Sequence, residues 1–401
     1  MNIIFLTISY PIDVKSNNNL YVDLVNELRS KGNNIYVVTS NERRNKKRTY
    51  LENIEGVNVL RIKTGNLQKI NVIEKGISTI LISYQFERAI NKYFKDIKFD
   101  LIVYSTPPIT FNNLIKRLKQ KNNAKTYLLL KDIFPQNAVD LGMIKDKGVM
   151  HTFFRNKEIN LYKCSDYIGC MSDLNKKYLL RNNLYIKEDK VEVFPNSIKV
   201  NNELSFDNKE EIKKELEIPK GAFILIYGGN LGKPQGIDFL LTIMKLNKNN
   251  NKIYFVIVGS GTEFSNIKNT IEKNNIKNVK ILSYVPKSKF NKYLSISDIG
   301  LIFLDKHFTI PNIPSRMLSY MENSLPIIAA TDKNTDLREY IRAGGFGEWC
   351  ENGDINSFKK IVNKFMYDKE LLKEMGRNSR KSLERKFDIK RNINIMLKHF
   401  Y

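Results

Sequence analysis

The segment from Asp298 to Ala330 limits the possible folds most, because two apolar runs in it enclose the start of a helix. Residues 299–304 and 326–330 have the composition of buried strands, and a proline-containing loop and a short helix starting at Pro314-Ser315 lie between them. A strand, a loop, a helix N-terminus and a second strand in this order are typical of parallel α/β sheets, which bind anions at such sites. We therefore expect a parallel sheet with an anion-binding edge here.

The same alternation of apolar runs and helical periodicity continues through both halves of the chain. It predicts parallel sheets covered by helices, and 401 residues are more than one ordinary domain needs. The clearest strands are expected at 2–8, 35–39, 57–62, 101–104, 167–171 and 190–194 in the first half, and at 223–227, 253–258, 279–282, 299–304 and 327–329 in the second.

A polar segment divides the two halves. Residues 198–220 are rich in Asn, Lys and Glu, which is typical of a linker with a short helix. We therefore predict one α/β domain at 1–198 and a second at 199–384. The C-terminal segment 385–401 is predicted to cross back to the first domain.

The chain is strongly basic, with a formal net charge of +24. Such a charge is compatible with an anionic membrane surface, nucleic acid or phosphate-bearing substrates, and equally with a proteome that is rich in Lys and Asn. The basic residues are dispersed, and no helix-turn-helix, RRM or KH signature accompanies them, so we expect no nucleic-acid partner. Three cysteines without paired spacing predict buried thiols in a reducing cytoplasm.

No apolar run reaches the roughly 18 residues that a membrane-spanning helix needs. The N-terminal run, MNIIFLTISYP, lacks the basic region and cleavage site of a signal peptide and is expected to be a strand. The predicted helix 70–95 has apolar positions on more than one face and basic ends. It either lies against an acceptor or a bilayer surface, or packs between the sheet and a neighbouring helix.

Glycine-rich turns follow the expected strands of the second half. The turn 227–236 contains four glycines, at positions where backbone N–H groups can approach a ligand closely. The dinucleotide fingerprint, the P-loop and any Asp-x-Asp pair are missing, so NAD, P-loop hydrolysis and a magnesium-bridged diphosphate are not expected. A bound diphosphate would then be met by helix N-termini and by side chains such as Lys233 and Arg316.

Seven motifs occur together in family order: STPP, KDIFPQNAVDLGM, FPNS, YGGNLGKPQG, VGSGTE, YVPKSKFNKYLSISDIGLIFL and PSRMLSYMENSLPIIA. On these motifs the chain resembles a retaining glycosyltransferase of family 4, most closely the WbuB-like branch. The resemblance implies the GT-B architecture, in which two Rossmann-like domains with parallel sheets face each other across a cleft. It also implies an N-terminal acceptor-binding domain and a C-terminal domain that binds the nucleotide-sugar donor.

The resemblance also places the donor site. Asn230 and Gln235 stand where the family has Arg and Lys phosphate ligands, while Pro311 and Ser319 stand where it has two glutamates, so backbone N–H groups around 312–316 are expected to do most of the donor recognition. Asn18 and Asn19 replace a Gly-Gly loop, and Asn tolerates positive φ best after Gly. The implied donor-binding residues are Asn18, Asn19, Gly229, Asn230, Lys233, Gln235, Gly259, Tyr284, Val285, Pro286, Asn312, Ile313, Pro314, Ser315, Arg316 and Ser319.

Three residues are candidates for the chemical step. Asp132 and Lys131 end a strand at the edge where α/β sheets bind ligands, and His307 lies in the loop of the opening segment. Asp132 is expected to accept a hydrogen bond from the attacking hydroxyl or to stabilise positive charge at the anomeric carbon; alternatively it caps the next helix. Lys131 contacts a phosphate or is a solvated strand end, and His307 touches the donor or is simply exposed.

The resemblance implies a complete activity. A hexosyl or N-acetylhexosaminyl group, such as an N-acetylated amino or deoxy-amino sugar, would pass with retention from a UDP-sugar to a polyprenyl-diphosphate-linked saccharide in capsule, O-antigen or exopolysaccharide assembly. No metal and no cofactor besides the donor substrate are expected. The enzyme would be cytoplasmic and peripheral at the anionic inner face of the cell membrane. A sugar-nucleotide epimerase of the same fold, a nucleic-acid-binding protein and a non-catalytic scaffold are the alternatives.

Overall fold

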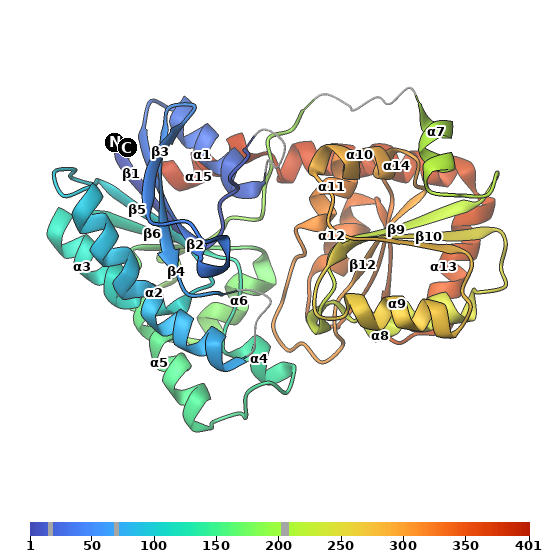
Figure 1. Cartoon of the computed structure of the whole chain (residues 1–401), viewed down its shortest axis with the longest axis horizontal. Coiled ribbons are helices and arrows are strands. Elements are labelled where there is room, and N and C mark those ends of the chain that lie inside the picture. The colour runs from blue at the N-terminus through green and yellow to red at the C-terminus, as the bar shows by residue number, and fades with distance from the viewer. Residues whose placement is uncertain (15–18, 68–71, 202–207) are drawn as a thin grey trace. The chain divides into compact units, whose positions relative to one another are not determined.

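The computed structural model describes residues 1–14, 19–67, 72–201 and 208–401. The chain divides into two compact units (Figure 1). The first unit contains residues 1–12, 19–196 and 389–401, and the second contains 197–388 together with the described residues 13–14. Each is an α/β unit built on its own sheet, so the prediction of two Rossmann-like domains with parallel sheets is confirmed.

The first unit is built on a sheet with the strand order β3-β4-β2-β1-β5-β6-β7-β8. All neighbours in it are parallel except β3 and β4. The strands are β1 (Asn2–Thr7), β2 (Asn34–Glu42), β3 (Tyr50–Ile54), β4 (Val57–Thr64), β5 (Leu101–Ser105), β6 (Lys125–Leu130), β7 (Tyr167–Cys170) and β8 (Val191–Val193).

The antiparallel strand β3 was not predicted. It pairs with β4 through a two-residue turn in which Glu55 has φ 51° and Gly56 has φ 85°. Positive φ at both central residues is the geometry of a type I′ hairpin turn, which usually carries Asn-Gly. The Glu-Gly pair of this chain gives a weaker signal, so the hairpin was not recognised.

Helices cover both faces of this sheet (Figure 1). α1 and α15 pack together on one face, and α2, α3 and α5 pack on the other. Their bounds are α1 (Leu20–Ser30), α2 (Val72–Tyr93), α3 (Asn112–Asn122), α4 (Gln136–Asp140), α5 (Val149–Cys164), α6 (Asp173–Asn182) and α15 (Ile389–Leu397), with short 3₁₀ turns at η1 (Arg43–Asn45), η2 (Ile109–Phe111) and η3 (Glu188–Lys190).

The second unit holds a fully parallel sheet in the order β11-β10-β9-β12-β13-β14. Its strands are β9 (Phe223–Asn230), β10 (Ile253–Ser260), β11 (Val279–Leu282), β12 (Ile299–Phe303), β13 (Ile327–Thr331) and β14 (Gly347–Glu351). Its helices are α7 (Lys209–Glu215), η4 (Lys233–Gln235), α8 (Ile237–Leu246), α9 (Phe264–Lys273), α10 (Lys287–Ser295), α11 (Arg316–Glu322), α12 (Leu337–Gly344), α13 (Ile355–Tyr367) and α14 (Lys369–Lys386).

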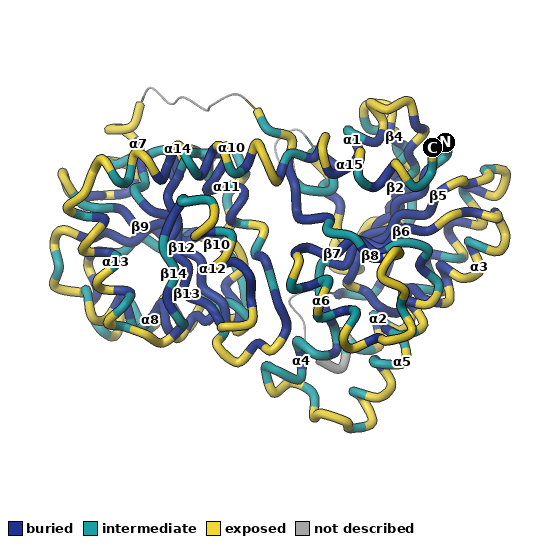
Figure 2. The backbone as a smooth tube through the Cα atoms, turned by 180° about the vertical axis from the view of Figure 1, so that it is seen from behind, coloured by how far each residue is buried: buried dark blue, intermediate teal, exposed yellow. Residues whose placement is uncertain are grey.

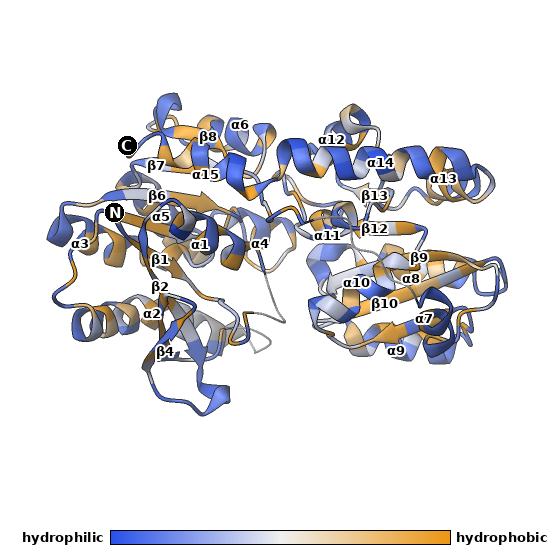
Figure 3. Cartoon of the chain, turned by 90° about the horizontal axis from the view of Figure 1, so that it is seen from above, coloured by the Kyte–Doolittle hydropathy of each residue, from blue (hydrophilic) through white to orange (hydrophobic). Residues whose placement is uncertain are grey.

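The central strands of both sheets are buried, and the exposed residues gather on helices and loops (Figure 2). All residues of β5, β12 and β13 are buried, as expected for parallel strands covered on both faces. Hydropathy follows the same pattern, with hydrophobic strands inside each unit (Figure 3). The interior of each unit is therefore apolar, and polar residues lie mainly on the helices, on the loops and at the ends of the strands.

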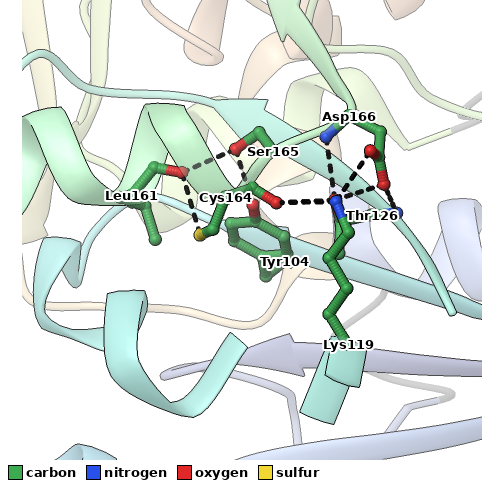
Figure 4. Close-up of polar contacts among 7 residues, drawn as sticks. All are labelled: Tyr104, Lys119, Thr126, Leu161, Cys164, Ser165 and Asp166. Carbon is green, nitrogen blue, oxygen red and sulfur yellow. Dashed lines mark hydrogen bonds and ion pairs between the residues drawn. The ribbon is translucent and has the colours of Figure 1, made fainter. Parts of the chain in front are cut away.

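A polar network closes the amino-terminal edge of the first sheet (Figure 4). The Asp166 carboxylate accepts hydrogen bonds from Lys119 at 2.7 Å and from the Thr126 hydroxyl and backbone N–H, both at 2.9 Å. Burial alone would raise the pKa of Asp166, but these hydrogen bonds outweigh it and hold the pKa below its ordinary value. The network links α3 to β6 and to the start of β7. It lies at the edge opposite to the carboxyl-terminal strand ends.

The C-terminal segment belongs to the first unit, although its sequence follows the second. The His399 ring stacks on Tyr167 with the centroids 3.9 Å apart, and its Nε2 lies 2.8 Å from Glu192 Oε2. Tyr401 donates to Asn33 at 2.8 Å. Inside the segment Ile393 is fully buried. None of the helices in the described parts of the chain has the length and apolar character to span a bilayer.

We predict that Ile393→Ala destabilises the first unit selectively. The lost side chain leaves a cavity, which costs about 2–5 kcal/mol in comparable cores. The only tryptophan, Trp349, lies in the second unit. Denaturant titration followed by circular dichroism should therefore show an earlier transition, while the transition in Trp349 fluorescence stays in place. The exposed neighbour provides the control Asn394→Ala, and equal shifts in the two signals would contradict the assignment.

Candidate functional site

Two strands of the second unit come unusually close at their carboxyl-terminal ends. Gly259 of β10 is in register with Gly229 of β9, and a Cβ atom on Gly259 would collide with the carbonyl oxygen of Gly229. Gly229 itself has φ 122°, a conformation that L side chains rarely adopt. Both positions therefore require glycine, and the backbone at this edge carries no side chains that would keep a ligand away.

Arg316, the first residue of α11, lies directly beside this bare backbone. Its guanidinium carbon is 4.3 Å from the ring centre of Tyr227 and 3.6 Å from the place that a Cβ on Gly229 would take. Its Nη1 atom is buried and has no hydrogen-bond partner in the described part of the chain. Because a buried charged donor without a partner is costly, this geometry favours an anionic ligand at Gly229.

Two buried tyrosines hold Arg316 and the glycine turn in place. Tyr320 receives a hydrogen bond from the Gly228 N–H and donates one to the Leu301 carbonyl, both at 3.0 Å. Tyr227 donates to the Asn230 carbonyl at 2.8 Å. Burial raises the pKa of both phenols above the ordinary value, so both remain neutral donors. The tyrosines link β9, β12 and α11 into one rigid support.

The turn after β9 is held by its own side chains. Asn230 Nδ2 donates to Gln235 Oε1 at 2.7 Å, so two of the residues predicted to bind the donor form a hydrogen bond with each other. Lys233 is exposed on η4. Tyr284, 63% exposed, Val285 and Pro286 connect β11 to α10 at the same edge of the sheet.

The loop from 305 to 315 is fastened to the turn after β13. Asn334 Nδ2 donates to the Phe308 carbonyl, and the Thr335 hydroxyl donates to the Asn312 carbonyl, both at 2.6 Å. His307 is 65% exposed, with Nδ1 2.7 Å from Asp305 Oδ1. The remaining predicted residues of this segment lie in the loop and in α11. Pro311 and Ile313 are buried, Asn312, Pro314 and Ser319 are partly buried, and Ser315 is exposed.

In the first unit, Asp132 follows β6 and is held firmly. Both of its carboxylate oxygens lie 2.8 Å from Asn137 Nδ2, and its backbone N–H donates to the Thr106 hydroxyl at 3.2 Å. The N-cap residue of α4 is Pro135. The carboxylate thus has a fixed orientation at the carboxyl-terminal edge of the sheet.

Lys131, the residue before Asp132, reaches back over the end of β8. Its Nζ lies 3.4 Å from the Phe194 carbonyl and 5.3 Å from the centre of the Phe194 ring. Burial lowers the pKa of Lys131 to about 7, although the neighbouring Cys170 acts in the opposite direction. Burial raises the pKa of Cys170 well above its ordinary value, so this thiol stays neutral. Lys131 can therefore gain or lose a proton near neutral pH.

The predicted asparagine loop differs from expectation. Asn18 lies outside the described residues. Asn19 has φ −131°, which is extended backbone rather than the expected positive φ, and its side chain accepts hydrogen bonds from the N–H groups of Tyr21 and Val22. Asn19 is the N-cap of α1, a position for which Asn is among the preferred residues. Within the described ranges, no group of three or more His, Cys, Asp or Glu residues could hold a metal ion.

Comparisons with known proteins agree with this architecture. Residues 208–382 match the family model described as glycosyl transferases group 1. The probable glycosyltransferase WbjE of Pseudomonas aeruginosa is 22% identical over 297 residues, which are 74% of this chain and 72% of that protein. The N-acetyl-alpha-D-glucosaminyl L-malate synthase of Bacillus anthracis is 24% identical over 177 residues, 44% of this chain and 45% of that one. The chain therefore has the GT-B fold, and its second unit is similar to the group 1 glycosyl transferases.

Solved structures share the fold over the full length. Sucrose-phosphate synthase from Thermosynechococcus elongatus has a TM-score of 0.77 at 16% identity and covers 100% of this chain and 99% of its own. HepE of Anabaena in complex with UDP has a TM-score of 0.71 at 13% identity, with 100% coverage of both chains. WaaG, titled a glycosyltransferase involved in lipopolysaccharide biosynthesis, has a TM-score of 0.70 at 11% identity and covers 99% of both. The assignment to family 4 and to the WbuB-like branch stays a prediction.

The predicted residues thus lie at the carboxyl-terminal edges of two separate sheets. Sequence reasoning placed Gly229, Gly259 and Arg316 in one site, and the structure brings them together. The prediction from the sequence did not include Tyr227, Tyr320 and Thr335, which position Arg316 and the loop before it. The available signal was weak, since a tyrosine in an apolar strand or helix is ordinarily part of the core.

We predict a pH dependence from Lys131. Because its folded pKa is lowered towards 7, the unfolded state binds more protons between pH 7 and 10.5, so this residue makes stability rise with pH in that window. The melting temperature of the wild type minus that of Lys131→Met should increase from pH 6 to pH 9. The subtraction cancels the titration of Cys170. A constant difference across this range would show that Lys131 keeps its ordinary pKa.

Proposed function

We propose that this protein is a glycosyltransferase and that it transfers a sugar from a UDP-sugar to a lipid-diphosphate-linked saccharide during surface-polysaccharide assembly. The observation that carries the proposal is the buried, unpartnered Nη1 of Arg316 beside the side-chain-free backbone at Gly229. A guanidinium with free donors suits phosphate oxygens, and glycine backbone lets a diphosphate approach closely. The site lies within the group 1 glycosyltransferase region.

The nature of the donor follows from the relatives. HepE of Anabaena, which shares the fold, has been solved in complex with UDP and with UDP-glucose. This supports a nucleotide-sugar donor here, with UDP as its nucleotide. The base would lie along Tyr284 to Pro286, where an exposed ring and backbone follow β11. The sugar is proposed to be an N-acetylated amino or deoxy-amino hexose.

The proposed chemistry proceeds with retention and without a metal. The acceptor hydroxyl forms the new bond to the anomeric carbon while the bond to the diphosphate breaks, and its proton passes to an oxygen of the leaving diphosphate. Asp132 accepts a hydrogen bond from the attacking hydroxyl, and its own orientation is fixed by Asn137. Arg316 stabilises charge on the leaving diphosphate. No carboxylate pair flanking the bond is needed, unlike in hydrolytic retaining enzymes.

The acceptor is proposed to be a polyprenyl-diphosphate-linked saccharide at the inner face of the cell membrane. WaaG, a structural neighbour, is described as acting in lipopolysaccharide biosynthesis. The chain also has a membrane-compatible surface at the corner between α4 and α5 of the first unit. Met143, Val149, Met150 and Phe153 are 40–89% exposed there. Lys145 and Lys147 are exposed in the connecting turn, which adds attraction to anionic lipids.

We predict that Arg316→Met weakens UDP binding while Ser319→Ala does not. Loss of a charge-assisted contact should raise the Kd for UDP about tenfold or more. Methionine preserves the apolar packing on Tyr227, and Arg316→Lys should retain part of the affinity. Isothermal calorimetry with UDP measures all three variants. Unchanged binding by Arg316→Met together with a loss in Ser319→Ala would refute the assignment of the diphosphate site.

We predict sugar transfer when the purified protein is incubated with a panel of UDP-sugars and a short lipid-diphosphate-linked saccharide. Transfer should persist in the presence of EDTA, and product analysis should show retention at the anomeric carbon. Asp132→Asn should lower kcat more than it raises KM for the donor, since the residue acts on the attacking hydroxyl. The absence of transfer with every donor, combined with no UDP binding, would reject the proposed function.

We predict that Val149→Asp reduces binding to vesicles that contain phosphatidylglycerol. Val149 is 89% exposed, so the fold should tolerate the change, and losing one inserted apolar side chain should weaken binding about tenfold. Leu184→Asp, at a position 90% exposed elsewhere in the first unit, is the matched control. Sedimentation of the protein with vesicles measures the effect. Equal losses in both variants would show that only net charge matters.

A further inference from the structure

A pocket lies in the first unit at a place that the proposed chemistry does not use. It has a volume of about 700 Å³ and lies where β4 ends, between η1 and the first turns of α2. β4 is parallel to β2, so the pocket is at the carboxyl-terminal edge of the sheet, where α/β proteins bind ligands. Its lining residues are Arg43, Lys63, Thr64, Gly65, Glu74, Ile77, Ser78, Leu81 and Gln85.

One side of this pocket is polar and carries two cations. Arg43 Nη2 is 3.6 Å from Glu74 Oε1, whereas Lys63 is exposed and has no carboxylate partner among the described residues. The side-chain oxygen of Gln85 is buried and unpartnered within the described ranges. Because the two ends of an amide side chain are interchangeable, Gln85 can also present its N–H₂ group to a ligand. This side is suited to an anion with several oxygen acceptors.

The other side is apolar and continues onto the surface. Ile77 and Leu81 line the pocket, and with Ile80 and Tyr84 they form an exposed ridge on α2, each 49–63% exposed. The spacing i, i+3, i+4, i+7 places them on one helix face, while Ile82 and Phe86 point to the core. The predicted two-sided apolar helix therefore has one face in the core and one face that no other described residue covers.

A ligand that satisfies both sides has a phosphate next to a hydrocarbon chain. We propose that this pocket binds the phosphate group and the adjoining hydrocarbon of the lipid that carries the acceptor saccharide. The inference rests on the proposed function. A second nucleotide fits less well, because the apolar residues that line the pocket, Ile77 and Leu81, are aliphatic and provide no ring on which a base could stack. A free sugar would likewise leave the apolar wall unused.

The position in the sheet agrees with a role in acceptor binding. In the strand order β4-β2-β1-β5-β6, four spacings separate the end of β4 from the end of β6, where Asp132 lies. At about 4.8 Å each, these spacings amount to about 19 Å along one sheet edge. An elongated acceptor can therefore place its lipid phosphate at Arg43 and Lys63 and its reacting hydroxyl at Asp132. Both ends of the proposed acceptor would then bind along the carboxyl-terminal edge of the first unit's sheet.

The test measures binding of farnesyl phosphate, a short polyprenyl phosphate, to the full-length protein. Lys63→Glu should raise its Kd about tenfold or more through loss of a charge-assisted contact, and Leu81→Ser should raise it through loss of apolar area. Lys98→Glu and Leu184→Ser, at exposed positions of the first unit, should leave it unchanged. UDP binding should be unaffected in all four variants.

Three outcomes would overturn the inference. The first is equal affinity of Lys63→Glu and Lys98→Glu for farnesyl phosphate. The second is inorganic phosphate binding as tightly as farnesyl phosphate, because the ridge would then contribute nothing. The third is binding of phosphatidylglycerol vesicles that depends on Lys63 while farnesyl phosphate binding does not, because the occupant would then be a bilayer lipid. A failure of the proposed function would give a different result: UDP binding or sugar transfer would be absent, while the affinities of the variants for farnesyl phosphate would be as expected here.

Discussion

The close approach of two parallel strands at Gly229 and Gly259 is the constraint on which the candidate site of the second unit depends. Side chains are excluded there by the backbone itself, so any polar group that serves the site must come from another element. Arg316 is that group: it is half-buried, its guanidinium lies over the Tyr227 ring, and α11 sets its position. Substrate binding would then complete a pairing that the folded protein leaves open.

Most of the fold could be predicted from the sequence, because long parallel strands leave a strong signal of continuous apolar runs between helical segments. Weak local signals were missed. The hairpin of β3 and β4 uses Glu55-Gly56 in place of Asn-Gly. Asn19 was interpreted as a loop residue that can tolerate positive φ, although its side chain caps α1. In both cases the same residue types support more than one turn geometry.

The site was only partly predictable for a different reason. Gly229 and Arg316 are 87 positions apart, and a spacing rule cannot show that they meet. Tyr320 bridges the Gly228 N–H and the Leu301 carbonyl, a role that depends on the packing of three elements against one another. The fully buried Tyr227 and Tyr320 were therefore indistinguishable from ordinary core tyrosines until the elements were assembled.

The arrangement of charge in the first unit explains how adjacent residues can have different tasks. Lys131 turns toward Phe194, where burial lowers its pKa, whereas the Asp132 carboxylate accepts hydrogen bonds from Asn137. In the proposed mechanism, a fully charged lysine beside Asp132 would compete with the acceptor hydroxyl for the carboxylate. Because Lys131 lies over the Phe194 ring, the Asp132 carboxylate is oriented by hydrogen bonds from the neutral Asn137 amide. Such hydrogen bonds are weaker than an ion pair, so a substrate can share the carboxylate more easily.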